Sequence, residues 1–285
     1  MMFRDQTAHR RKHLRMGLSA LCVVSISLFY GCSASTKEIR PEADAQLLPV
    51  EDEVKFGYYV DAVVCSEFPV LKDERLTAQV SAIGNSLVDK SLRPDLDFNF
   101  RILNTETVNA FAAPGGFVYI TIGLLDKLES KDELAAILGH EIGHVCARHS
   151  IKAWYTAQKI SKPLTVIDIA AIIAGLPPIA SAGGDIIADV GQTVAQLASV
   201  IVYQGYSRTY EYQADELGLQ EMYHAGYDPE ATISVFEKLI RLREEEGNGE
   251  GIVLLSSHPP MEDRIEHTRS FLAGLQDPHS GSTDD

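Results

Sequence analysis

The sequence predicts an α+β protein that is mainly helical, with one small sheet beside a long helix. Apolar residues recur at helical intervals from Glu51 onward. Between residues 97 and 121 the pattern changes to the alternation that is typical of strands. Ser130 followed by Glu133 then forms a capping box, so a helix is expected to begin one residue after Ser130. This helix carries the motif "HEIGH".

The first two elements are expected to be helices over residues 51–68 and 73–92. In the first, the apolar positions that can line one side are Val54, Tyr58, Val63 and Val64. In the second, the positions at helical intervals are Leu76, Val80, Ile83, Leu87 and Val88. Each helix therefore has one face to bury against a core.

Strands are expected next. In "DFNFRIL" (97–103), the residues that alternate with polar neighbours are Phe98, Phe100 and Ile102. "VNAFAAPGGFVYITIG" (108–123) predicts two further extended pieces, joined at the turn Pro114-Gly115-Gly116. These three pieces make up the predicted sheet.

The motif "HEIGH" begins at His140. His140 and His144 are four residues apart, which separates them by only about 40° around a helix axis. Both imidazoles can therefore reach one metal ion, and Glu141 lies close enough in azimuth to face the same cleft. His149 falls near the opposite face of a continuous helix, so it is not expected to be a ligand.

A catalytic zinc site takes three ligands from the protein, so a third ligand is needed in addition to the two histidines. "SRTYEYQADELGLQEMYHAG" (207–226) predicts a second helix that faces the first, with Gly226 as its C-cap and Gly218 allowing close approach. Glu211 and Asp215 share one face of it. Glu211 is the natural third ligand, and Asp215 is placed to accept the distal N–H of a ligating histidine. The alternative is a solvated acidic pair, which is common in an acidic chain.

The chain has 285 residues, 45% of them hydrophobic, and a formal net charge of -15. This length fits one large domain or two small ones. An acidic surface repels phosphate backbones, so nucleic acid is not an expected partner. Four cysteines are too few for a disulfide scaffold. Cys65 and Cys146 would either pair in an oxidising compartment or remain buried helical thiols.

Residues 1–31 have the order of a secretory signal, with a basic, an apolar and then a small-residue part. The apolar part is short for a membrane-spanning helix, which needs about 20 residues. The ending on Cys32 resembles a bacterial lipoprotein signal, in which that cysteine is lipidated, although Phe29 and Tyr30 depart from the usual residues. A retained membrane anchor, or cleavage without a lipid, is the alternative. Residues 32–50 are expected to be a polar tether.

Residues 160–203 are apolar or small, and they are interrupted at Pro177-Pro178 and Gly183-Gly184. Neither half holds an unbroken run of about 18 apolar residues, so neither is expected to span a bilayer. The expectation is a buried helical hairpin packed on the "HEIGH" helix. A lid that faces a partner or a membrane is the alternative.

"HEIGH", "SRTYEYQADELG" and "AGYDP" together resemble the HtpX and CAAX-prenyl-protease type of zinc metallopeptidase, peptidase family forty-eight, and in particular its bacterial periplasmic lipoprotein branch. The resemblance covers residues 51–275 and leaves a polar tail at 276–285. HExxH with this later E-x-x-x-D is specific, whereas a bare HExxH arises by chance. The implied fold is a zincin-like (gluzincin) catalytic domain. The resemblance implies that one Zn2+ per chain is bound by His140, His144 and Glu211, with Glu141 as catalytic base.

The resemblance also implies a function. Glu141 would take the proton of the attacking water and pass it to the leaving amine. Expected substrates are misfolded or unassembled envelope proteins at the periplasmic face of the outer membrane, with inner-membrane anchoring as the alternative location. A rival function is an assembly factor or holdase for outer-membrane proteins with a latent site, which would work with envelope assembly machinery. Candidates for a second electrophilic donor are His258, Arg208, Tyr206 and Tyr210.

Two segments are expected to serve that chemistry. A substrate in extended form could add to the edge formed by Asn109, Ala110, Phe111, Gly115 and Gly116, where the glycines permit close approach. An ordinary hairpin turn is the alternative. His258 stands between a glycine-rich stretch and Pro259-Pro260, which begin another helix. It would reach the metal's open position or donate to the oxyanion, and a surface histidine that caps the helix is the alternative.

Overall fold

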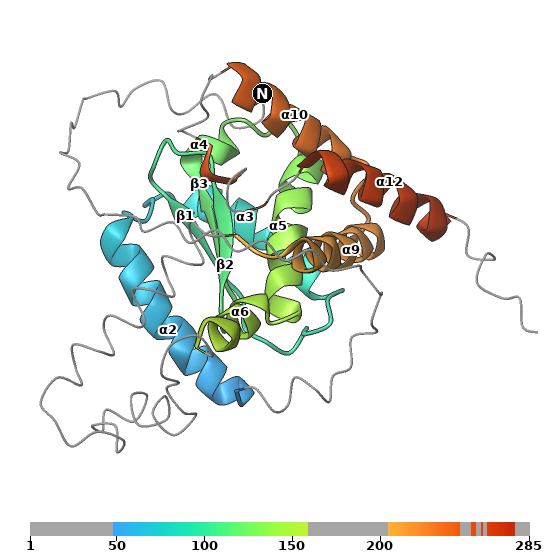
Figure 1. Ribbon diagram of the computed structural model, residues 1–285. Coiled ribbons are helices and arrows are strands. Elements are labelled where there is room, and N and C mark those ends of the chain that lie inside the picture. The colour runs from blue at the N-terminus through green and yellow to red at the C-terminus, as the bar shows by residue number, and fades with distance from the viewer. Residues whose placement is uncertain (1–47, 159–204, 246–251, 255–257, 259–260, 277–285) are drawn as a thin grey trace, which may run out of the picture.

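The protein is a three-stranded sheet with helices on both of its faces (Figure 1). The residues that the computed structural model describes are 48–158, 205–245, 252–254, 258 and 261–276. The predicted signal, Cys32 and the apolar segment 160–203 lie outside these residues. A mainly helical α+β fold is confirmed.

The sheet is built from β1 (Asn99–Leu103), β2 (Ala110–Ala113) and β3 (Phe117–Thr121), in the order β1-β3-β2. β1 runs parallel to β3, with Phe100 opposite Val118, and β2 runs antiparallel to β3. All of β2 and β3 is buried. The predicted strands are confirmed, and β2 is an outer strand of the sheet.

Helix α2 (Val50–Glu67) covers one face of the sheet (Figure 1). Its buried apolar side chains are Phe56, Val60 and Val64. Tyr58, which the sequence places on the inward side, is 56% exposed. The helix is therefore confirmed, but its predicted inward face is partly wrong.

Two buried acids account for the different inward face of α2. Glu53 is paired with Arg93 at 2.9 Å and with Arg148 at 2.9 Å. Asp61 accepts from Arg101 Nε at 2.6 Å. A buried carboxylate is tolerated only when it is paired or hydrogen-bonded. These partners are far away in the sequence. A prediction that places acidic residues in solvent therefore assigns the wrong face of the helix to the core.

The folded body begins before the predicted boundary. Leu48, which the sequence places in the tether, is only 1% exposed and packs with the α2 side of the sheet. The Arg148 side chain donates a hydrogen bond to the backbone oxygen of Leu48. The last residues of the predicted tether 32–50 therefore belong to the fold.

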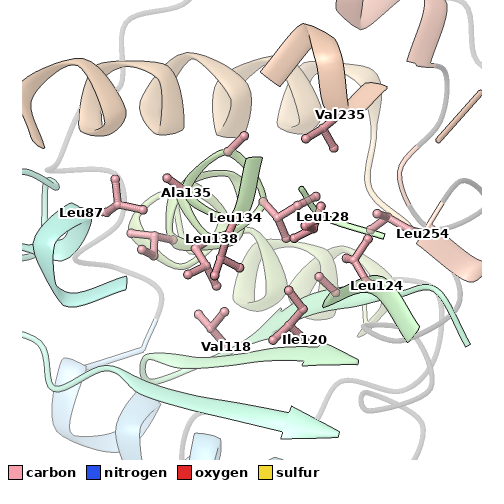
Figure 2. Packing of buried hydrophobic residues seen from close by; sticks show 14 of the residues in the cluster. Leu87, Val118, Ile120, Leu124, Leu128, Leu134, Ala135, Leu138, Val235 and Leu254 are labelled. Atoms are coloured by element: carbon pink, nitrogen blue, oxygen red, sulfur yellow. The ribbon is translucent and has the colours of Figure 1, made fainter. Parts of the chain in front are cut away.

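The other face of the sheet is covered by α3 (Glu74–Val88) and α5 (Lys131–Cys146), while α4 (Ile122–Leu125) follows β3 directly. Figure 2 shows this core, with α5 lying between the sheet below and α10 above. Labelled side chains that meet there are Leu87, Val118, Ile120, Leu134, Leu138 and Val235. The predicted inward residues of α3 are confirmed as buried or half-buried.

The remaining helices complete the body around α5. They are α6 (His149–Gln158), α9 (Arg208–Ala225), α10 (Ala231–Glu245) and α12 (Met261–Gln276). α9 packs along α5, and α12 packs on α9 and α10 (Figure 1). The side chain of Ser207 caps the start of α9 by accepting from the Tyr210 N–H, and the helix ends at the predicted C-cap Gly226, whose φ is 83°.

Within the described part of the chain, no helix has both the length and the apolar character that crossing a membrane requires. Cys65 on α2 is a half-buried free thiol, and Cys146 on α5 is a buried free thiol. Of the two alternatives for these cysteines, the structure therefore shows separate helical thiols.

Candidate metal centre

The residue at which α5 begins decides which face of the helix the motif residues occupy. Ser130 Oγ accepts from the Glu133 N–H at 3.0 Å. The Glu133 carboxylate accepts in turn from the Glu129 N–H at 2.6 Å. The predicted capped start is confirmed, and it places His140 and His144 on one side of a buried helix.

A close crossing of α5 and α9 brings the acidic pair of α9 to these histidines. A Cβ atom on Gly218 would lie 2.7 Å from the carbonyl carbon of Gly139. A Cβ atom on Gly143 would lie 2.6 Å from the backbone oxygen of Ala214. No side chain fits at either distance, so the two backbones meet only because these positions are glycine. The predicted role of Gly218 in close approach is confirmed.

Four buried side chains converge at this crossing. The Nε2 atoms of His140 and His144 are 3.0 Å apart. Each lies 3.5 Å from an oxygen of Glu211. His258 Nδ1 lies 3.2 Å from His140 Nε2. One ligand atom from each of the four residues lies within 4.8 Å of the other three.

These separations fit a metal ion. A tetrahedral zinc with bonds of about 2.0–2.1 Å places its ligand atoms roughly 3.3 Å apart. The measured pairs fall on both sides of that value, between 3.0 and 3.5 Å. Two imidazole nitrogens and a carboxylate, with a third imidazole beside them, are also the ligand types that zinc takes. The residues present therefore fit a zinc ion.

The ring of His140 is oriented from its far side. Asp215 Oδ1 lies 2.8 Å from His140 Nδ1. Burial alone would raise the pKa of Asp215, but the charges of Arg264 and His140 outweigh burial and hold this pKa well below its usual range. An ionised carboxylate only accepts, so His140 donates its Nδ1–H to it. With this proton on Nδ1, the metal-binding form of the ring presents the lone pair of Nε2 to the cluster. The structure places Asp215 where the spacing predicts it.

Arg264 is a buried charge at the site that the sequence does not indicate. It lies on α12 and is 1% exposed. Its Nε and Nη2 donate to the two oxygens of Asp215 at 2.8 and 2.6 Å, and its Nη1 lies 3.1 Å from Glu211 Oε2. Its charge offsets those of two buried carboxylates. Nothing in "MEDRIEH" distinguishes it from a surface arginine of an amphipathic helix.

Glu141 faces the cluster without a hydrogen-bond partner. Both of its side-chain oxygens are buried, and within the described residues neither has a partner. Its Oε1 lies 3.7 Å from His258 Nε2. Burial raises the pKa of Glu141, while the positive charges of His258 and His140 lower it, and burial dominates. A carboxylate with a raised pKa and free oxygens is suited to taking up a proton.

His258 is a member of the cluster. It is 1% exposed, and its Nδ1 lies 3.1 Å from both oxygens of Glu211. Burial lowers the pKa of His258, but the neighbouring charge of Glu211 more than compensates and raises it. The alternative of a surface histidine is therefore wrong, since α5, α9 and α12 surround this side chain.

The other candidates for a second donor are placed differently. The Tyr206 ring stacks on His144 with 4.2 Å between centroids. Tyr210 stacks on His149 at 4.2 Å. The Arg208 side chain is 68% exposed and pairs with an acid on α12. The structure therefore brings Tyr206 and His258 to the cluster and leaves Arg208 outside it.

The residues of the predicted substrate edge lie in two different places in the structure. Asn109, Ala110 and Phe111 are buried on the outer strand β2 or at its start. Just before them, the Val108 oxygen accepts a backbone hydrogen bond from Leu254 at 3.2 Å. Leu254, which precedes His258 by four residues, thus lies against this end of β2.

Gly115 and Gly116 do not belong to an accessible edge, so this part of the prediction is wrong. Their φ values of 75° and 92° form the turn between β2 and β3. A Cβ atom on Gly115 would lie 2.8 Å from the Cα of Val54 on α2, and one on Gly116 would lie 2.5 Å from the Asp97 oxygen. Both glycines are covered by other parts of the fold. They are needed for a hairpin turn, which was the alternative interpretation.

Comparisons with known proteins find relatives that are named as proteases. The chain is 26% identical over 253 residues to the beta-barrel assembly-enhancing protease of Escherichia coli (strain K12), covering 89% of this chain and 50% of that protein. It is 28% identical over 201 residues to metalloprotease LoiP of the same organism, covering 70% of each chain. It is 30% identical over 201 residues to the mitochondrial metalloendopeptidase OMA1 of Schizosaccharomyces pombe, covering 70% of this chain and 54% of that protein. The chain spans about half the length of the first of these relatives.

The family assignment follows from a match that includes every member of the cluster. The family model described as Peptidase family M48 matches residues 74–271, which is more than half of the chain. This range contains the "HEIGH" helix, the acidic pair of α9, His258 and Arg264. The chain belongs to peptidase family M48.

Proposed function

We propose that this protein is a zinc-dependent endopeptidase. The observation that carries the proposal is the convergence of His140, His144, Glu211 and His258 beside the buried, unpartnered carboxylate of Glu141. Membership of a peptidase family supports it. The proposed ligands of the ion are His140, His144 and Glu211.

Each residue of the site has a role in this proposal. A bound zinc ion would polarise the scissile carbonyl and make the attacking water more acidic. Glu141 takes the proton of that water and passes it to the leaving amine. Asp215 holds the His140 ring in one tautomer. Arg264 offsets the buried negative charges, which would otherwise repel one another at short range.

The proposed activity is tested with the purified full chain. We expect it to cleave casein, to lose cleavage in 1,10-phenanthroline and to recover it when zinc is restored. Absence of cleavage by the zinc-loaded chain, with casein or with unfolded outer-membrane protein, would refute the peptidase. It would favour the second candidate, an assembly factor or holdase with a latent site. That candidate is favoured by the burial of His258 within the cluster and by its contact with Glu211.

His258→Ala is expected to increase the rate of casein cleavage. His258 lies against Glu141 and against two of the proposed ligands, where the scissile carbonyl must also approach. Removing the imidazole opens this place. The measurement is steady-state cleavage by variant and parent at matched zinc content. A rate below the parent's would mean that His258 assists the reaction as a donor instead.

We propose that the substrates are misfolded or unassembled outer-membrane proteins. The name of one relative, beta-barrel assembly-enhancing protease, supports an action on proteins of this class. Envelope assembly machinery is a proposed partner on the same ground. The extended substrate would add to the outer strand β2 near Asn109, Ala110 and Phe111. Its approach requires the segment at Leu254 to move, because that segment lies along the same end of the strand.

We also propose that a lipid on Cys32 anchors the protein to the periplasmic face of the outer membrane of a Gram-negative bacterium. The support is the order of basic, apolar and small residues that ends at Cys32. Cys32→Ala is expected to release the chain from membranes or to leave its signal uncleaved. Mass spectrometry of the membrane form checks the lipid directly. A mature membrane form with an unmodified Cys32 would exclude it.

A further inference from the structure

His149 returns to the metal centre although helical spacing points it away. α5 ends at Cys146, and Arg148 then adopts a φ of 55°, a left-handed conformation that is uncommon outside glycine. α6 begins at His149. The direction of His149 is therefore set by this turn and not by continuation of α5. Its side chain is fully buried, with an exposed fraction of 0%.

Contacts with His144, Gln213 and Tyr210 hold the His149 ring. Its Nδ1 lies 2.9 Å from His144 Nδ1, and its Nε2 lies 2.9 Å from Gln213 Oε1. The ring of Tyr210 stacks on it at 4.2 Å with an interplanar angle of 12°. His149 thus lies behind His144, on the side opposite to the cluster. It is not one of the four residues whose ligand atoms converge.

The donors and acceptors in this chain can be assigned in order. Gln213 presents its carbonyl oxygen, which only accepts, so His149 donates its Nε2–H. In its neutral form, the His149 ring has a single N–H, which then lies on Nε2. Its Nδ1 is then an acceptor, and His144 must donate Nδ1–H to it. The lone pair of His144 is left on Nε2, which faces His140 Nε2 and Glu211.

We propose that His149 is a positioning residue which, together with Gln213, holds His144 in the tautomer that binds the metal. His140 has a carboxylate, Asp215, for the same purpose. His144 has no carboxylate on its Nδ1 among the described residues, and the neutral His149–Gln213 pair takes that place. The inference rests on the proposed zinc site. Removing an outer partner of a metal-binding histidine typically costs about 10–100-fold in metal affinity.

A matched pair of variants separates hydrogen bonding from packing. His149→Leu and His149→Asn introduce side chains of nearly the same shape, but only asparagine offers an acceptor to His144. We expect the zinc dissociation constant of His149→Leu to rise by about 10–100-fold, and His149→Asn to recover most of that loss. Zinc affinity of the full chain is measured by competition with a chelator, and circular dichroism of the zinc-free protein checks the fold.

Two further measurements keep the inference testable if His149→Leu does not fold. Gln213→Met removes the acceptor at the end of the chain while leaving His149 and Tyr210 in contact, and it is expected to weaken zinc binding. In the zinc-loaded parent, 15N-histidine NMR is expected to show His149 as the neutral Nε2–H tautomer. An Nδ1–H or doubly protonated His149, or equal weakening by leucine and asparagine, would overturn the inference.

Failure of this inference is distinct from failure of the proposed zinc site. If the parent chain binds no zinc, the proposed metal site is wrong and His149 has no ligand to orient. If the parent binds zinc and both His149→Leu and Gln213→Met match its affinity, the metal site stands and only the role of His149 is refuted.

Discussion

Glu141→Gln is expected to lower the rate of peptide cleavage by about 10²–10⁴-fold, the usual contribution of a general base. Glutamine has nearly the same shape as glutamate, but its amide cannot take up the proton of the attacking water. Because the Glu141 oxygens have no hydrogen-bond partner within the described residues, the substitution breaks no hydrogen bond of the fold. The measurement is casein cleavage by the zinc-loaded variant and by the parent.

A matched control for this prediction is Glu129→Gln. Glu129 precedes α5, and its side chain is 74% exposed, so its loss should leave cleavage unchanged. Zinc content and the thermal unfolding midpoint of Glu141→Gln should both match the parent. Cleavage by Glu141→Gln at the rate of the parent would mean that another base acts, or that a contaminating peptidase produces the activity.

Glu211→Ala is expected to reduce zinc occupancy sharply. Its carboxylate lies 3.5 Å from the Nε2 atoms of both His140 and His144, and it supplies the only negative charge among the four convergent ligands. Without Glu211, the proposed site keeps two of its three ligands, one fewer than catalytic zinc sites have. The loss should also leave Arg264 and His258 each without one buried partner. Metal analysis after dialysis measures the occupancy.

Glu216→Ala is the matched control for this variant. Glu216 lies on the same helix, α9, but its side chain is 36% exposed and pairs with His267 at 2.8 Å. Zinc occupancy should therefore be unchanged in Glu216→Ala. Full retention of zinc by a folded Glu211→Ala would place the third ligand elsewhere and would refute the proposed metal site.

Much of the candidate site was predictable because its residues lie at helical intervals. His140, Glu141 and His144 occupy neighbouring positions of one helix, and Glu211 and Asp215 occupy one face of another. The start of the first helix follows from Ser130, whose cap acts within a single turn. These relations span a few residues and depend only on the geometry of the α-helix. They needed no knowledge of the rest of the fold.

The predictions that were wrong share a different cause. The inward face of α2 depends on Glu53 and Asp61, whose partners come from other elements. His149 was placed by extending α5 beyond its end, where the turn at Arg148 changes the direction of the chain. Gly115 looked accessible because nothing nearby in the sequence shows that α2 covers it. In each case the deciding contact lies outside the segment that carries the pattern.

By itself, then, the sequence determined the mainly helical α+β class, the two helices of the site and the residues that they carry. Only the tertiary structure decided that Arg264 lies against Asp215 and Glu211, and that His258 lies within the cluster. Helical spacing relates residues within one element, where the backbone geometry is constant. Arg264 and Asp215 are 49 residues apart, on different helices. Such partners are brought together only when the helices pack, since a buried charge is stable only where the fold supplies its counterpart.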